Sequence, residues 1–310
     1  ILLGILMGNA FTPRPGMMIG LDFTQQYILK LGIIFLGIRL SFADFIKFGS
    51  IAIPLIIICI VGVLILVKLL IKKVPISSKM SYLIAIGTSV CGATAIVATA
   101  PVINAKKSEV AYAIANITLF GVIAMLLYPY FAEWYFDNEA LNIGLFLGTS
   151  IHETSQVAAA GLIYDQQFNS PETLNVATVT KLIRNTFLVV LIPLFAFLYN
   201  RGELKGQKYS IFNIFPYFVL GFIGMIIVRN LGDQFYPLGS NNHEIWVNLI
   251  EYFKILTTVF LTMAMAAVGI SINLSELKSM GYKPFVVGLI AAVTVGIISL
   301  IYIETLNKFI

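Results

Sequence analysis

The segment G-T-S-I-H-E-T-S-Q-V-A-A-A-G, residues 148–161, carries a histidine, a glutamate, a glutamine and several hydroxyl side chains. The chain around it consists mainly of Leu, Ile, Val and Phe. An ionisable side chain at the centre of a bilayer costs about 2.5–3.5 kcal/mol, so it is a candidate for function wherever it occurs. This argument applies only if the chain spans a membrane.

Composition identifies a multi-pass membrane protein. Hydrophobic residues make up 59% of the chain and charged residues 11%, with a mean hydropathy of +0.92, which is outside the range of soluble globular domains. Many apolar runs have the length that a helix needs to cross about 30 Å of hydrocarbon. We therefore predict an all-α fold with spans at residues 1–9, 25–41, 50–67, 80–104, 110–132, 141–163, 174–199, 211–229, 248–270 and 284–306.

The ends and loops of the chain complete this prediction. The first apolar run, which starts at Ile1, has only half the length of a span, and we expect at least one further helix before it. The net charge of +5 comes from Lys and Arg residues in short loops, where they act as topology signals, so no nucleic-acid partner is expected. The predicted cytoplasmic loops contain Lys68, Lys72, Lys73 and Lys79, and Arg201, Lys205 and Lys208.

Two internal repeats indicate the architecture. Residues 3–9 and 36–49 resemble residues 220–230 and 268–281, and the segment G-T-S-V-C-G-A-T-A-I-V-A-T-A-P, residues 87–101, resembles the opening segment. An odd number of predicted spans separates the first pair, so its copies face opposite sides of the bilayer. Inverted repeats of this kind are typical of secondary transporters. We predict one transmembrane domain over residues 1–310, with inverted-repeat segments 1–75 and 211–306 and discontinuous core segments 80–132 and 141–199.

The two segments rich in Gly, Ser, Thr and Ala are predicted to be discontinuous helices. Small residues also allow close helix packing, which is the structural alternative, but clustered Gly, Ser and Thr let a helix open within the membrane. Lys79, Lys106 and Lys107 flank the first segment and favour a re-entrant hairpin, whereas a pair of interrupted helices that cross completely is the other arrangement. In both arrangements the tips meet near the midplane.

Two cations lie on the span that follows. In N-V-A-T-V-T-K-L-I-R, residues 175–184, Lys181 and Arg184 lie roughly 10–15 Å along a helix that begins near Leu174, and their spacing places them on one face. Glu153 can neutralise one of them, which leaves positive charge for an anionic substrate. The alternative is a purely structural pair of Glu153 with either cation. Breaks at Thr88-Ser89 and Thr149-Ser150 would add backbone N–H donors for the anion.

The predicted site residues come from these three segments. His152 and Glu153 are predicted to change protonation and couple transport to protons, with a His152 ring that caps a neighbouring helix carbonyl as the alternative. Arg39 is predicted to be an interface anchor, and Asn9 and Asn230 to be helix caps. The residues predicted to bind substrate are Lys181, Arg184, Asn185, Ser89, Cys91, Gly92, Thr94, Thr149, Ser150, Ser155 and Gln156.

These motifs resemble a known family. Residues 87–103, A-I-A-N-I-T-L-F-G-V-I-A-M-L-L-Y-P (113–129), S-I-H-E-T-S-Q-V-A-A-A-G (150–161) and K-L-I-R (181–184) are similar to the bacterial YeiH-like membrane proteins, for which sulfate export is the suggested activity. The likeness covers essentially the whole chain, but Asn185 stands where the family tends to have Val or Leu. The resemblance implies the fold of the cation/proton antiporter and anion transporter superfamily, a homodimer, a small anionic solute and the bacterial inner membrane.

Residues and resemblance together predict a secondary active transporter of sulfate, an organosulfonate or a related carboxylate. Protons are the expected coupling ion and sodium ions the other candidate. A cation/proton exchanger is the nearest alternative, and a receptor or structural protein that binds without flux is the alternative of another class. We do not expect an enzyme, because Cys91 has no sequence-local orienting pair. Two distant histidines and the lack of a Cys-x-x-Cys motif predict neither a metal nor a cofactor.

Overall fold

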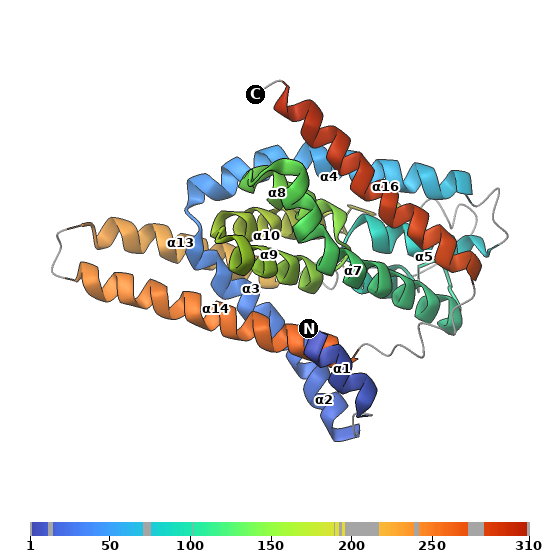
Figure 1. The fold of residues 1–310 in the computed structure, drawn as a ribbon, viewed down its shortest axis with the longest axis horizontal. Helices are drawn as coiled ribbons and strands as arrows, with labels where there is room; N and C mark the ends of the chain where they lie inside the picture. The colour runs from blue at the N-terminus through green and yellow to red at the C-terminus, as the bar shows by residue number, and fades with distance from the viewer. Residues whose placement is uncertain are drawn as a thin grey trace. The chain divides into compact units, whose positions relative to one another are not determined.

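Helices form the regular structure of the protein. A computed structural model describes residues 2–11, 15–70, 76–100, 102–188, 190–191, 194–195, 217–238, 242–271 and 282–308, and every regular element within these ranges is helical (Figure 1). Five of its helices are long and apolar enough to cross a membrane, which confirms the prediction of an all-α multi-pass membrane protein. These helices cover Phe42–Leu70, Ser108–Phe136, Phe218–Phe235, His243–Ala264 and Lys283–Asn307.

The five long helices correspond to predicted spans. The spans predicted at residues 50–67, 110–132, 211–229, 248–270 and 284–306 each overlap one of them. Other predicted features fall wholly or largely outside the described residues: Lys72, Lys73, the loop with Arg201, and the ends of segments 174–199 and 268–281. The orientation of the two repeats across the membrane stays a prediction.

The chain forms two compact units. Unit 1 consists of Ile1–Phe48 and Pro216–Glu276, and unit 2 of Gly49–Phe215 and Leu277–Ile310. Helix α4 (Phe42–Leu70) has its first residues in unit 1 and the rest in unit 2. Unit 1 contains most of both copies of the first repeat, whereas unit 2 contains both small-residue segments.

In unit 1, helices from the two segments of the chain pack against each other. Helix α14 packs against α1 and α3, and α13 packs against α3. Gly37 allows the close approach of η2 and α13, because a Cβ atom there would collide with the carbonyl of Phe222. The elements are α1 (Leu2–Ala10), α2 (Pro15–Phe23), the π-helical turn η1 (Thr24–Ile28), α3 (Leu29–Leu36), the 3-10 turn η2 (Gly37–Arg39), α13 (Phe218–Phe235) and α14 (His243–Ser271).

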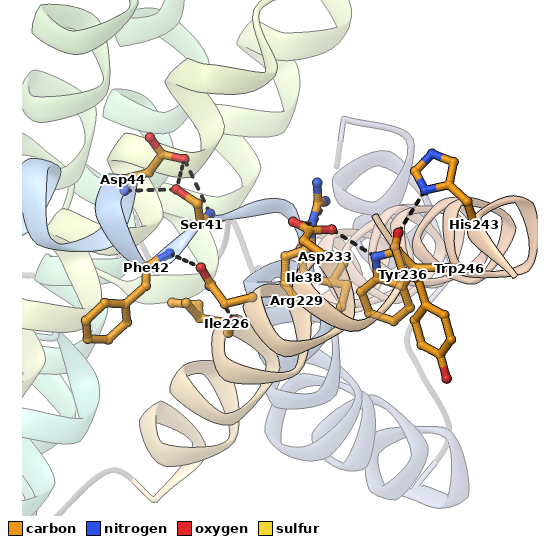
Figure 2. Close-up of polar contacts among 11 residues, drawn as sticks. Ile38, Ser41, Phe42, Asp44, Ile226, Arg229, Asp233, Tyr236, His243 and Trp246 are labelled. Atoms are coloured by element: carbon orange, nitrogen blue, oxygen red, sulfur yellow. Dashed lines mark hydrogen bonds and ion pairs between the residues drawn. The ribbon is translucent and has the colours of Figure 1, made fainter. Parts of the chain in front are cut away.

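A break between η2 and α4 is held by side chains of unit 1. Ser41 and Asp44 bond reciprocally, with the Ser41 Oγ donating to Asp44 Oδ2 at 2.6 Å and accepting from Asp44 N at 3.1 Å. From α13, Asn230 Oδ1 accepts the N–H of Phe42 at 3.2 Å. Arg229 also lies on α13 and donates to the Ile38 carbonyl at 3.2 Å (Figure 2). Asn230, predicted to be a helix cap, thus caps a helix other than its own.

Asp233 fixes the arginine of this arrangement. Its Oδ2 atom accepts from Arg229 Nε at 2.7 Å and its Oδ1 atom from Trp246 Nε1 at 2.8 Å, so one carboxylate joins α13 to α14 (Figure 2). The backbone groups that the break frees therefore obtain partners from a neighbouring helix, as groups at helix ends require.

Unit 2 surrounds helix α10. Helix α10 packs against α8 and α9, α5 packs against α7, and α16 packs against α5, α7 and α8. Asp137 and Asn169 adopt left-handed conformations with φ of 48° and 54°, which end α7 and α9 and allow short turns. The helices are α5 (Ser78–Ser89), α6 (Ala93–Thr99), α7 (Lys107–Phe136), α8 (Ala140–Ser150), α9 (Thr154–Phe168), α10 (Pro171–Thr186) and α16 (Tyr282–Asn307).

Both small-residue segments contain an interruption. The residues 90–92 separate α5 from α6, and residues 151–153 separate α8 from α9. The predicted breaks at Thr88-Ser89 and Thr149-Ser150 thus lie one residue too early, since both serines are the last residues of their helices. Gly92 has φ +68° and ψ −127°, a conformation that is open to glycine and strained for other residues. The choice between hairpins and crossing helices stays a prediction.

The cap on α4 gives a first prediction. Asn230→Ala removes the acceptor of the Phe42 N–H, and loss of a helix N-cap costs about 1 kcal/mol. We expect a lower apparent melting temperature for the detergent-purified protein. Asn307→Ala, at the exposed C-terminal end of α16, is the matched control and should leave that temperature unchanged. Equal melting temperatures for both variants would contradict the assigned cap.

Candidate functional site

Lys181 joins the two interruptions. Its side chain is fully buried, and its ammonium donates to the carbonyls of Val90 at 2.8 Å, Ile151 at 3.0 Å and His152. An ammonium group has three N–H donors, so all of them are used. Val90 and Ile151 are the first residues after the two Gly-Thr-Ser motifs, so this cation binds equivalent carbonyls in both repeats.

Arg184 repeats this arrangement one turn later. Its guanidinium is also fully buried. Nε donates to the Ser89 carbonyl at 2.7 Å, and the two Nη atoms donate to the carbonyls of Thr88 and Thr149, again equivalent positions. A guanidinium has five N–H donors. Two of them therefore have no acceptor in the part of the chain that the structure describes.

The two cations stabilise the C-terminal ends of α5 and α8. The last carbonyls of a helix have no partner within the helix and carry partial negative charge. Lys181 and Arg184 supply the missing donors from α10, which packs against α8. Both side chains reach both small-residue segments from one helix, and their bonds in this structure are to backbone carbonyls. Direct contact with a substrate stays a prediction for both.

Glu153 connects the start of α6 to the start of α9. Its Oε1 atom accepts the N–H of Ala93 at 3.1 Å. A Cβ atom on Gly92 would collide with the Glu153 side chain, so the glycine provides the space for this carboxylate. Lys181 uses its three donors elsewhere, so the ammonium gives no hydrogen bond to Glu153. The carboxylate is half-buried, in contrast to the fully buried cations.

His152 and several hydroxyl groups have unused hydrogen-bonding capacity. His152 is buried, and within the described residues both of its ring nitrogens are without a partner, so the alternative of a ring that caps a helix carbonyl does not describe this structure. The hydroxyls of Ser89 and Ser150 are buried and unpartnered in the same part of the chain. Because buried polar groups are nearly always satisfied, these atoms favour a bound water or a polar ligand.

Two other predicted site residues stabilise the fold. Thr149 Oγ1 bonds to the Leu145 carbonyl and to Ser299 Oγ, each at 2.7 Å, which links α8 to α16. Gln156 accepts from the Glu153 N–H at 3.2 Å and donates to the Thr118 carbonyl of α7 at 3.3 Å.

The side-chain amide of Asn185 uses its nitrogen but not its oxygen in a hydrogen bond among the described residues. Its Nδ2 atom donates to Thr154 Oγ1 at 2.9 Å, whereas its Oδ1 atom is buried without a partner among the described residues. The remaining predicted residues lie close by in the chain: Ser155 is buried, Cys91 is a buried free thiol, and Thr94 is exposed.

The structure adds residues that were not predicted. Thr88 and Thr180 have buried hydroxyls without partners in the described part of the chain, and Thr154 orients Asn185. Thr88 and Thr154 lie inside the two quoted motifs, so motif membership could have suggested them. Ser299 lies 150 residues from Thr149, and no local pattern marks it.

The formal charges of the side chains at the interruptions sum to a positive value. Two helix C-termini and two helix N-termini lie next to these side chains, and their partial charges of about half a unit each cancel. The remaining charges are those of Lys181, Arg184 and an ionised Glu153, so about one positive charge remains. Such a region can attract an anion, although its two cations are covered by carbonyls.

Known proteins share this sequence over nearly its whole length. A family model described as Conserved hypothetical protein 698 matches residues 1–288. The UPF0324 membrane protein FN0533 of Fusobacterium nucleatum is 34% identical over 306 residues, 97% of this chain and 88% of that protein. The UPF0324 membrane protein SAG1125 of Streptococcus agalactiae is 35% identical over 298 residues, covering 96% and 85%.

A further relative gives a location. The UPF0324 inner membrane protein YeiH of Escherichia coli K12 is 32% identical over 299 residues, 94% of this chain and 80% of that protein. No solved structure matches the chain. The names of these relatives agree with the five apolar helices in indicating a membrane protein.

Substitution of Lys181 tests its role at the two helix ends. Lys181→Met leaves three buried carbonyls without a donor, and we expect a loss of about 3–5 kcal/mol in the free energy of unfolding. The apparent melting temperature of the purified protein measures this loss. Lys254→Met, which removes an exposed 2.6 Å pair with Glu251, is the control and should cost less than about 1 kcal/mol. Similar losses in both variants would refute the assignment.

Substitution of Gly92 tests the first interruption. Gly92→Ala combines a strained positive φ with a collision against Glu153, so we expect a smaller monodisperse fraction in size-exclusion chromatography. Gly224→Ala is the matched control, because Gly224 lies in α13 with no atom near a Cβ added there. In a helix this change is neutral or stabilising. A Gly92→Ala protein as monodisperse as the control would show that the turn does not need glycine.

Proposed function

Because the chain belongs to the membrane-protein family described as Conserved hypothetical protein 698, we propose that it is a secondary transporter of a small anion. The inner membrane, where the name of the E. coli relative places that protein, is the proposed location. One observation carries the proposal: two interrupted helices end around Lys181 and Arg184, with unpartnered polar atoms beside them.

The interruptions supply what a transport site in a membrane needs. Irregular backbone at membrane depth is tolerated where protein or a water-filled cavity satisfies it, and transporters bind their substrates where discontinuous helices meet. Here the freed carbonyls are satisfied by α10, and the region keeps about one positive charge. A small anion is the solute that this charge favours.

The proposed anion ligands are the groups that keep free capacity. Arg184 contributes its two remaining N–H donors, and Ser89 and Ser150 contribute hydroxyls. Asn185 Oδ1 and the two ring nitrogens of His152 are likewise buried without partners among the described residues. Sulfate, an organosulfonate or a related carboxylate offers the several acceptor oxygens that these donors match. Lys181, whose donors are all used, is proposed to act through the backbone and not through direct contact.

Proton coupling is the proposed source of energy. His152 and Glu153 lie in the second interruption, and neither side chain donates to a helix carbonyl among the described residues. A change of protonation at either one alters the charge that the anion meets. We do not propose an enzymatic activity, because Cys91 is a buried thiol whose sequence surroundings contain no orienting pair.

A cation/proton exchanger is the second candidate. The observation in its favour is that Glu153 is half-buried while Lys181 and Arg184 are fully buried, so the carboxylate is the more accessible charge. Such an exchanger would dissipate a pH gradient when sodium or lithium ions are added, and would not exchange anions. An anion transporter shows the opposite pair of results.

Counterflow into proteoliposomes tests the proposal. Vesicles are loaded in turn with sulfate, taurine or succinate and then receive external radiolabelled sulfate, with labelled taurine and succinate in parallel series. We expect transient accumulation of label driven by at least one internal anion. Arg184→Lys, which loses the fork-shaped donor set, should reduce the rate by about tenfold or more. Lys254→Met, the exposed control named above, should stay near the wild-type rate.

Some results would contradict anion transport, and another would contradict only the assigned site. Absence of counterflow with every anion, in vesicles shown to hold folded protein, would remove anion transport, and a sodium-driven pH change would then establish the exchanger. Saturable anion binding without counterflow would instead indicate a receptor or structural role. Full activity in both Lys181→Ala and Arg184→Ala would leave anion transport in place but refute this site.

A further inference from the structure

Glu153 differs from the other charged side chains at the interruptions. Lys181 and Arg184 are fully buried, and His152 is almost so. Glu153 is half-buried, and so are its neighbours Ala93 and Thr154. Glu153 is therefore the most exposed of these charged and titratable side chains.

The Glu153 side chain is positioned by the backbone of Gly92 and Ala93. Its Oε1 atom accepts the Ala93 N–H at 3.1 Å, and its methylene groups occupy the space that Gly92 leaves free. The Lys181 ammonium is directed to the carbonyls of Val90, Ile151 and His152. Lys181 thus uses its three donors on carbonyls and gives no hydrogen bond to Glu153.

The other titratable and charged groups around Glu153 come from four places. His152 precedes it in the same segment, and Lys181 and Arg184 face the interruptions from α10. Cys91 lies in the interruption between α5 and α6, and Cys59 is a buried thiol of α4. Glu153 is the one carboxylate in this set. Its protonation would therefore remove the negative charge of the set.

We propose that the anion and a proton bind together and cross the membrane in the same direction, with Glu153 as the proton carrier. This inference rests on the proposed anion transport and adds the sign of its coupling. Ionised Glu153 repels an anion in a region of low dielectric constant. Protonated Glu153 removes that repulsion, so anion binding and proton binding favour each other.

The charge balance of the cycle follows from this arrangement. With Glu153 ionised the interruptions carry about one positive charge, and with Glu153 protonated they carry about two. A monovalent anion then returns the net charge to about one. The carrier without substrate returns with Glu153 ionised and bonded to Ala93, so its net charge is the same as that of the loaded form with a monovalent anion.

Luminal pH tests the sign of coupling. Proteoliposomes contain a fluorescent pH dye in weak buffer at the same pH inside and outside, and potassium with valinomycin clamps the membrane potential. The anion that gave counterflow, in the first instance sulfate, is added outside. We expect the lumen to become more acidic. An alkaline shift, or no shift while counterflow of the same anion proceeds, overturns this inference and leaves anion transport intact.

Variants assign the proton carrier. Glu153→Gln should abolish the acidification and make any residual counterflow independent of pH, whereas Glu153→Asp should keep a shift of the same sign. Glu172→Gln is the matched control, because Glu172 is an exposed carboxylate at the start of α10, and it should behave as the wild type. Acidification that persists in Glu153→Gln but is lost in His152→Gln overturns the assignment to Glu153.

The design separates the two levels of the proposal. If no anion gives counterflow, the proposed function fails, and this inference fails with it. If counterflow occurs, the wild-type pH shift alone decides between symport and exchange of anion for proton. The result for the wild type also stands if Glu153→Gln does not fold.

Discussion

The need to satisfy the backbone at broken helix ends is the constraint on which this structure depends. Lipid offers no hydrogen bonds, so an unpaired carbonyl at membrane depth costs several kcal/mol. Lys181 meets this need for three carbonyls from two interruptions, and Arg184 for three more. In unit 1, at the break before α4, Arg229 donates to the Ile38 carbonyl and Asn230 accepts the N–H of Phe42. Both units thus use polar side chains of an intact helix to support a broken one.

The positions of the long helices could be predicted from the sequence, because the thickness of the hydrocarbon sets their length. A span needs a minimum length of apolar sequence, so the five long helices could be located from composition alone, and small residues marked the two interrupted segments. The ends of α5 and α8 could not be placed to the residue. They depend on the positive φ of Gly92 and on carbonyl partners of Arg184 that lie 35 to 96 residues away.

The candidate site shows the same limit. The spacing of Lys181 and Arg184 predicted a shared helix face, and the structure shows that both side chains reach both motifs. A count of charged side chains could not show that these cations bind carbonyls. The partial negative charge at a helix C-terminus belongs to the backbone and has no charged residue to mark it in the sequence. It also could not separate the two cations. An ammonium has three donors and a guanidinium five, so equal numbers of carbonyls saturate the first and leave capacity on the second.

The equivalent positions of the bound carbonyls have a mechanical consequence. Lys181 bonds to the residue after each Gly-Thr-Ser motif, and Arg184 to the threonine within each motif. Helix α10 therefore acts as a single strut between α5 and α8. Neither helix end can shift without breaking bonds to a side chain that also holds the other. The two interruptions are expected to move as one rigid block, so that the polar groups between them keep their mutual geometry while the access to them changes.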